Sequence, residues 1–78
     1  MPDYQTAVAY ILALLEPRNR SGRPLGEATD LVADVGLSSL QVMELIERLE
    51  DHFDLSIPLN ILPDISTVGD LAAKLQEL

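Results

Sequence analysis

The sequence contains no cysteine and no tryptophan, and its aromatic residues are two tyrosines and one phenylalanine. Without cysteine there are no disulfide bonds, thiolate metal sites or cysteine nucleophiles, so any thiol chemistry requires a bound cofactor. No apolar run approaches the roughly 20 residues that span a bilayer, and Met1-Pro2-Asp3 lacks the basic start of a secretory signal. We therefore expect a cytoplasmic protein without membrane insertion.

Basic residues are also scarce: five lysines and arginines stand against 13 acidic residues, for a net charge of −8. This charge repels nucleic acid and anionic lipid and favours partners with basic patches, whose encounter it accelerates. The alternative is that acidity serves only solubility. At 78 residues with 47% hydrophobic residues, the chain predicts a single globular domain over residues 1–78 and a monomer.

No catalytic or metal-binding constellation is present. The carboxylates lack the spacing of an H-E-x-x-H motif or an EF-hand loop, so we expect no metal site. The single histidine, His52, lies roughly 20 Å along a predicted helix from the nearest serine pair, too far to form a Ser-His-Asp triad. We therefore expect a protein that is not itself an enzyme, with His52 as a partly buried structural residue beside Phe53.

Hydrophobic periodicity predicts an all-α protein. Helices are expected over residues 3–16, ended by Pro17, over residues 38–53, and over residues 68–77 with Leu78 in its buried stripe. The apolar segment 59–62 is too short for more than one helical turn before Pro63. The fold class is therefore a small four-helix bundle, with three main helices and one short helix.

A long loop, residues 17–37, connects the first two main helices. Its first part is rich in proline, glycine and arginine, whereas Val32 is among several apolar residues expected to anchor its second part on the core. A helical turn is possible over residues 29–33. The second main helix starts with a capping box of Ser38 and Gln41; Thr67 caps the last helix, with Asp70 at its third position.

A wheel of the second helix separates two faces. One arc is apolar and predicts the core face: Val42, Leu45, Ile46, Leu49 and Phe53. The other is acidic with two apolar residues near its start, which suits a docking surface for basic partners: Leu40, Met43, Glu44, Glu47 and Asp51. The alternatives are that single exposed apolar residues need no explanation, or that Leu40 packs under the preceding loop.

Two serines, Ser38 and Ser39, stand at the start of this helix. A helix N-terminus offers unpaired amide groups and a positive dipole end, so a phosphate attached there is stabilised. No base lies nearby to activate either hydroxyl, so another enzyme would have to perform chemistry at the serine. By this reasoning alone, capping is the favoured interpretation, because serine pairs at helix starts are mostly caps.

Three segments resemble the acyl carrier protein family. The family's phosphopantetheine attachment segment is similar to residues 34–45, DVGLSSLQVMEL. Its F-x-x-x-I-P turn is similar to FDLSIP at 53–58, and its I-x-T-V-x-D-L entry to the last helix is similar to ISTVGDL at 65–71. The resemblance implies a 4'-phosphopantetheine arm on Ser39, attached by a phosphopantetheinyl transferase, with Ser38 as the cap. It also implies acyl cargo held as thioesters, and docking of acyl-loading and acyl-using enzymes on the second helix.

Three positions depart from the family pattern, and one of them, the third helix, favours a specialised carrier over the general fatty-acid one. Ser38 replaces the usual aspartate before the modified serine, which leaves the identity of the transferase open. The usually acidic third helix is the apolar segment 59–63, a candidate gate for a sheltered acyl chain. Glu47 occupies a position that is often apolar. The sequences at 57–60 and 67–70 look like those of dedicated carriers of bacterial lipid pathways, including sphingoid-base synthesis.

Other interpretations stay open. An aminoacyl or peptidyl carrier shares the fold and the arm, and an unmodified helical adaptor would use the docking face only for binding. Arg18, Arg20 and Arg23 form the only basic cluster. This cluster is either a solvated loop or a contact for a partner or for the phosphate of the arm.

Overall fold

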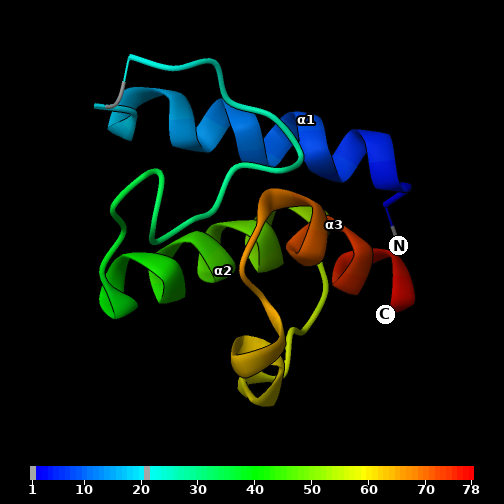
Figure 1. Ribbon diagram of the computed structural model, residues 1–78. Helices are drawn as coiled ribbons and strands as arrows, with labels where there is room; N and C mark the ends of the chain where they lie inside the picture. Colours follow the sequence, from blue (N-terminus) through cyan, green and yellow to red (C-terminus); the bar gives the residue numbers. More distant parts are fainter. Residues whose placement is uncertain (1, 21) are drawn as a thin grey trace.

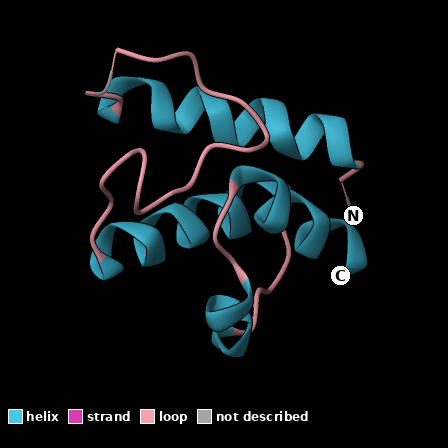
Figure 2. Ribbon diagram, in the orientation of Figure 1, coloured by secondary structure: helices cyan, strands magenta, loops and turns pink. Residues whose placement is uncertain are grey.

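The computed structural model describes residues 2–20 and 22–78, and its regular structure is helical (Figures 1 and 2). Apart from one isolated antiparallel bridge between Asp30 and Thr67, the described residues contain no strand pairing. The helices are α1 (Tyr4–Leu15), η1 (Glu16–Arg18), α2 (Ser39–Phe53), η2 (Leu59–Asp64) and α3 (Val68–Glu77), with η1 and η2 of the 3-10 type. The predicted all-α class and the bounds of the last helix are confirmed.

The core lies between the three α-helices. In Figure 1, α1 and α2 lie across from one another, and η2 projects on the side away from α1; α3 packs against α1. Each α-helix contributes an apolar stripe, and the largest fully buried side chains are Ile11, Leu15, Ile46, Leu49, Val68, Leu71 and Leu75. No buried side-chain nitrogen or oxygen in the described part lacks a hydrogen-bond partner. The bundle is thus held by apolar packing without a polar core.

Side-chain caps fix where the main helices begin. The predicted capping boxes are both present, with Ser38 and Gln41 on α2, and with Thr67 and Asp70 on α3. The Asp70 carboxylate accepts hydrogen bonds from the amides of Thr67 at 3.1 Å and Ser66 at 3.0 Å. These bonds favour the ionised form and hold the pKa of Asp70 below its usual value. This cap therefore stabilises the fold above the ordinary aspartate pKa and weakens as the pH falls through the lowered one.

Two prolines lie inside 3-10 turns, so helical structure continues through them. Pro17 does end α1, but it then lies inside the 3-10 turn η1, where its fixed φ is compatible with a first turn. Pro63 likewise lies inside η2, which runs two residues beyond the predicted segment 59–62. The 3-10 geometry continues through proline because a short helix has few amide bonds to lose.

The connection between η1 and α2 is joined to the start of α3. The amide of Leu31 donates to the carbonyl of Ser66 at 2.9 Å, and the amide of Val68 donates to the carbonyl of Thr29 at 3.0 Å. A third bond runs from the amide of Gly69 to the carbonyl of Glu27 at 2.9 Å. Turn structure spans residues 31–35, two residues later than the predicted helical turn at 29–33. The pairing with α3 sets this register.

Three side chains are more exposed than the sequence predicted. Leu78 follows the last residue of α3 and is 37% exposed, so it is not part of the buried stripe. Val32 is 59% exposed, whereas its neighbours Leu31 and Val35 anchor the connection in the core. His52 is exposed instead of partly buried, and its ring stacks on Tyr10 with centroids 3.7 Å apart.

Candidate functional site

A sharp turn delivers the chain to the start of α2. Gly36 has a φ of +84°, in the left-handed region that glycine adopts at low cost. Its amide donates to the carbonyl of Val32 at 3.0 Å, and the amide of Leu37 donates to the carbonyl of Leu31 at 3.1 Å. The Leu37 side chain is buried. The two serines that follow are therefore held in place on both sides, by the turn before them and by α2 after them.

The two serines have different environments. The Ser38 hydroxyl oxygen accepts from the Gln41 amide at 3.2 Å, while the Gln41 side-chain oxygen accepts from the Ser38 amide at 2.9 Å. The Ser39 side chain is exposed on the first turn of α2, and its hydroxyl has no hydrogen-bond partner among the described residues. Ser38 is thus the helix cap, whereas the Ser39 hydroxyl is available to an approaching enzyme.

An apolar hollow lies beside Ser39. It has a volume of about 190 Å³ and is lined by Ser39 and Met43 of α2, Val32 of the connection, Leu62 of η2, and Ile65, among others. Sequence reasoning missed this hollow because its walls come from three segments that only the folded chain brings together. The apolar character of Leu62 was noted, but nothing in the sequence places it near Ser39.

These features fit a phosphopantetheine arm on Ser39. The amides of Ser39 and Leu40 have no partner in the described part of the chain, so they and the helix dipole can stabilise a phosphate there. The hollow offers apolar surface next to the attachment point. Among the described residues, no group of three or more histidine or acidic side chains is placed to hold a metal ion.

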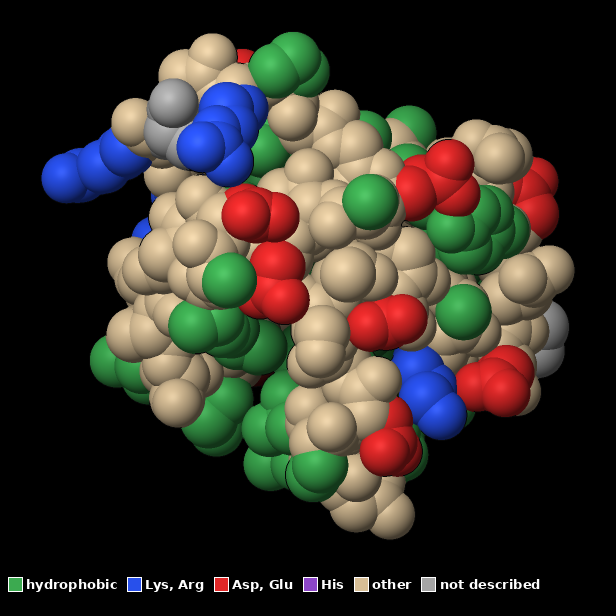
Figure 3. Space-filling view, in the orientation of Figure 1, with side chains coloured by type: hydrophobic (Ala, Val, Ile, Leu, Met, Phe, Trp, Pro, Cys, Tyr) green, Lys and Arg blue, Asp and Glu red, His purple; other side chains and the backbone are tan. Residues whose placement is uncertain are grey.

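All five residues of the predicted docking face are exposed. Leu40 is 66% and Met43 39% exposed, and the three acidic members, Glu44, Glu47 and Asp51, are exposed along the same side of α2. Leu40 therefore does not pack under the preceding loop. Figure 3 shows hydrophobic side chains gathered over the first turns of α2 and over η2. The face combines a small apolar area with a carboxylate row.

The arginine cluster does not lie at Ser39. Arg18 lines a different hollow, together with Gln41. Gln41 follows Ser39 by two residues, so at roughly 100° per residue the two side chains lie on nearly opposite sides of α2. Arg20 lines the adjoining space with Gly36 and Leu37. In Figure 3, basic side chains project beside the connection that follows α1. The structure therefore does not bring Arg18 to a phosphate on Ser39.

Comparisons with known proteins agree on one family. The family described as "Phosphopantetheine attachment site" matches residues 9–75. The chain is 37% identical over 73 residues to a "Probable acyl carrier protein" of Caulobacter vibrioides, covering 86% of this chain and 85% of that protein. It is 42% identical over 77 residues to an "Acyl carrier protein" of an Exiguobacterium species, and the match covers 95% of this chain and 86% of that protein.

A solved structure shares the fold. A chain described as "a putative acyl carrier protein" from Mycobacterium tuberculosis superposes with a TM-score of 0.75 at 33% identity, over 88% of this chain and 93% of that one. Across the part that the structure describes here, no helix has both the length and the apolar character needed to cross a membrane.

Proposed function

The chain belongs to the acyl carrier protein family, and from this we propose that Ser39 is the residue that carries its 4'-phosphopantetheine and that the cargo is an acyl group of lipid or secondary-metabolite synthesis. As a member of this family the protein has a phosphopantetheine attachment domain and is a carrier, not an enzyme. A phosphopantetheinyl transferase is thereby an implied partner. When bound, the group supplies the thiol that this cysteine-free chain lacks.

One observation supports the assignment to Ser39. Of the two adjacent serines, only Ser38 uses its hydroxyl in a helix cap, while Ser39 leaves its hydroxyl exposed and unpaired within the described residues. The chain presents this hydroxyl but provides no base for it, so the transferase must remove the proton. α2 orients the hydroxyl, and the hollow formed with Val32 and Leu62 shields apolar atoms next to it from water.

The acidic face of α2 is proposed as the docking surface for the transferase and for acyl-loading and acyl-using enzymes with basic patches. The exposed Leu40 and Met43 provide a small desolvated contact, and the carboxylates around them steer a basic partner. Flexible Met43 suits a surface that must fit several partners in turn. Such docking is weakened by salt because exposed charges are screened beyond about 10 Å at 0.1 M ionic strength.

A dedicated bacterial lipid pathway is favoured over general fatty-acid synthesis. The helix η2 carries one acidic residue, Asp64, and exposes Leu59 at 54%. The central Glu47 adds charge to the docking face. Partners that fit this surface would need an apolar contact for η2 and a basic centre. The apolar η2 also supports the alternative of an aminoacyl or peptidyl carrier.

A loading experiment separates these functions. The protein is incubated with a phosphopantetheinyl transferase and coenzyme A, and intact mass spectrometry is expected to show one phosphopantetheine per chain. The modified protein is then offered to a fatty-acyl ligase and to an amino-acid adenylating enzyme. We expect acylation by the first and not the second. Aminoacylation alone would support the alternative carrier type, and failure of every transferase to modify the chain would support an unmodified adaptor.

The docking face can be tested by charge reversal. The double variant Glu47→Lys with Asp51→Lys is expected to lower kcat/KM for modification by the transferase about tenfold or more at low salt, because steering by surface charge acts mainly on association. The difference should shrink as salt rises. The measurement is the initial rate of mass conversion at several salt concentrations.

A matched control carries the same change in net charge elsewhere. Glu16→Lys with Glu77→Lys also reverses two exposed charges, one on η1 and one on α3, outside the proposed face. We expect the decrease in kcat/KM of this control variant to be several-fold smaller than that of the Glu47→Lys, Asp51→Lys variant. Equal losses in the two variants would mean that net charge, and not the α2 face, governs docking.

A further inference from the structure

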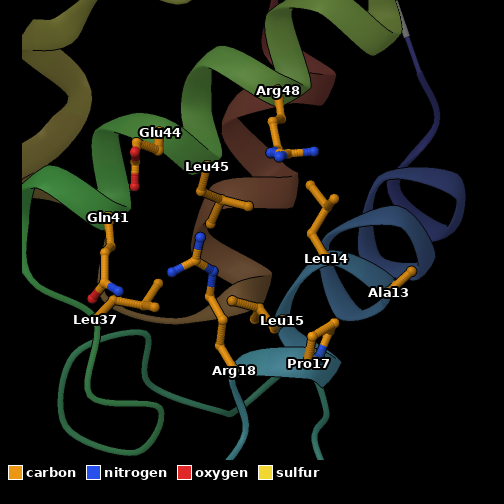
Figure 4. A pocket seen from close by; sticks show the side chains of 10 residues that line it. All are labelled: Ala13, Leu14, Leu15, Pro17, Arg18, Leu37, Gln41, Glu44, Leu45 and Arg48. Carbon is orange, nitrogen blue, oxygen red and sulfur yellow. The ribbon is translucent and has the colours of Figure 1, made fainter.

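A second hollow lies on the other side of α2 from Ser39, where η1 and the end of α1 face α2. It has a volume of about 250 Å³. Its apolar lining includes Leu14, Leu15, Leu37 and Leu45, and three of these leucines are buried members of the core. Figure 4 shows the leucine side chains turned into the space between the two helices. An apolar group in this hollow would therefore contact the exposed edge of the core.

Two arginines enter the same hollow from opposite elements. Figure 4 shows Arg18 reaching in from η1 and Arg48 reaching in from α2. Neither forms an ion pair, although the chain has 13 acidic residues; among the described residues the only ion pair joins Lys74 and Glu77 at 3.6 Å. The lining therefore carries two positive charges beside an apolar surface, which favours binding of an anion.

The lining selects the kind of anion. Guanidinium groups bind carboxylates in a bidentate geometry, which provides both strength and orientation. Glu44 also lines the hollow, so the two arginines and this carboxylate leave a net charge of +1, which one carboxylate neutralises, whereas a dianion such as phosphate would leave an uncompensated negative charge. A single negative charge is therefore favoured. The leucines add a requirement for an apolar chain on the same molecule.

The volume limits the length of that chain. The hollow is open to solvent, and its volume of about 250 Å³ leaves room for a chain of several carbons, such as that of hexanoate. The hollow beside Ser39 contains no basic side chain. A neutral chain has no reason to prefer the second hollow, whereas a carboxylate does.

We infer that the hollow between α1, η1 and α2 is a second binding site that takes an aliphatic monocarboxylate of short to medium chain length. Arg18 and Arg48 bind the carboxylate, and the leucine wall buries the chain. The site is separate from the attachment serine, so this inference does not depend on Ser39 carrying phosphopantetheine. A small exposed site of this size binds with a dissociation constant on the order of millimolar.

The test is a proton–nitrogen NMR titration of the unmodified protein with hexanoate at constant ionic strength. We expect saturable shifts at the amides of residues 14–16, 18, 37 and 45–48. Arg18→Gln and Arg48→Gln should each raise the dissociation constant about fivefold or more, since each removes a charge-assisted bond. The matched control Lys74→Gln removes one positive charge outside the hollow and should leave binding unchanged, as should Ser39→Ala.

Acetate and 1-hexanol complete the experiment, because acetate lacks the apolar chain and hexanol lacks the charge. Both are expected to bind at least several-fold more weakly than hexanoate. Equal binding of acetate, equal binding of hexanol, or shifts confined to the residues around Met43 and Ile65 would each overturn the inference. Shifts at the hollow that depend on protein concentration without hexanoate would assign it to a second copy of this chain instead.

Discussion

Ser39→Ala is expected to abolish the gain of one phosphopantetheine mass that wild-type protein shows with a transferase and coenzyme A. The substitution removes the oxygen that would form the phosphodiester, and no other hydroxyl has the same position. Ser38 lies next to it, but its oxygen is occupied by the Gln41 amide and its side chain belongs to the cap. Intact mass spectrometry after overnight reaction measures the loss, which should be complete and not partial.

Ser38→Ala is the matched control, since it removes the same atom one residue away. This variant should still be modified, but it loses a helix cap and is expected to be less stable by about 1 kcal/mol. Ser39→Ala should unfold like wild type, because its side chain is exposed and unpaired in the described part of the structure. Modification of Ser39→Ala together with none of Ser38→Ala would move the attachment site to Ser38.

Leu49→Ala is expected to cause the largest loss of stability among the changes considered. Leu49 is fully buried between the helices at 0% exposure. Truncating a buried leucine removes its transfer free energy and leaves a cavity, at a cost of about 2–5 kcal/mol. A domain of this size has little reserve, so the midpoint of thermal unfolding should fall by roughly 10–40 °C. Circular dichroism during heating and urea titration measures both quantities.

Leu40→Ala is the comparison within the same helix. Leu40 is 66% exposed, so the same substitution should cost within about 0.5 kcal/mol. Its effect should instead appear in the rate of modification by the transferase, where Leu40 is proposed to contact the partner. Similar destabilisation by both substitutions would contradict the division of α2 into a core face and a docking face.

The starts of the main helices could be predicted from the sequence because each is marked by local chemistry. Ser38 with Gln41 and Thr67 with Asp70 are capping pairs, whose hydrogen bonds join residues three apart and so require no knowledge of the tertiary fold. The same local reasoning separated the buried Leu45, Ile46 and Leu49 from the exposed Leu40. The 3.6-residue period of a helix determines which side chains share a face, so the apolar stripe can be located from the sequence alone.

What could not be predicted depends on segments distant in sequence. The register of the connection is set by two backbone hydrogen bonds, from the Leu31 amide to the Ser66 carbonyl and from the Val68 amide to the Thr29 carbonyl, which no local pattern indicates. The position of His52 depends on the Tyr10 ring from another helix. The two hollows have the same origin, since each gathers side chains from separate elements. The cap at Ser38 was therefore predictable, whereas the surroundings of Ser39 were not.

The hollow beside Ser39 has one rigid side and one compliant side. Leu31 and Ser66 belong to segments joined by a backbone hydrogen bond, and Leu31 is itself a core residue. The opposite boundary includes Leu62 of η2, a helix with no side-chain cap and no buried residue. Displacing η2 would separate the partly buried Ile61 and Leu62 from the core, whereas moving the other side would disturb the entry to α3. If a bulkier group entered this hollow, η2 would therefore move outward, while the three α-helices would keep their arrangement.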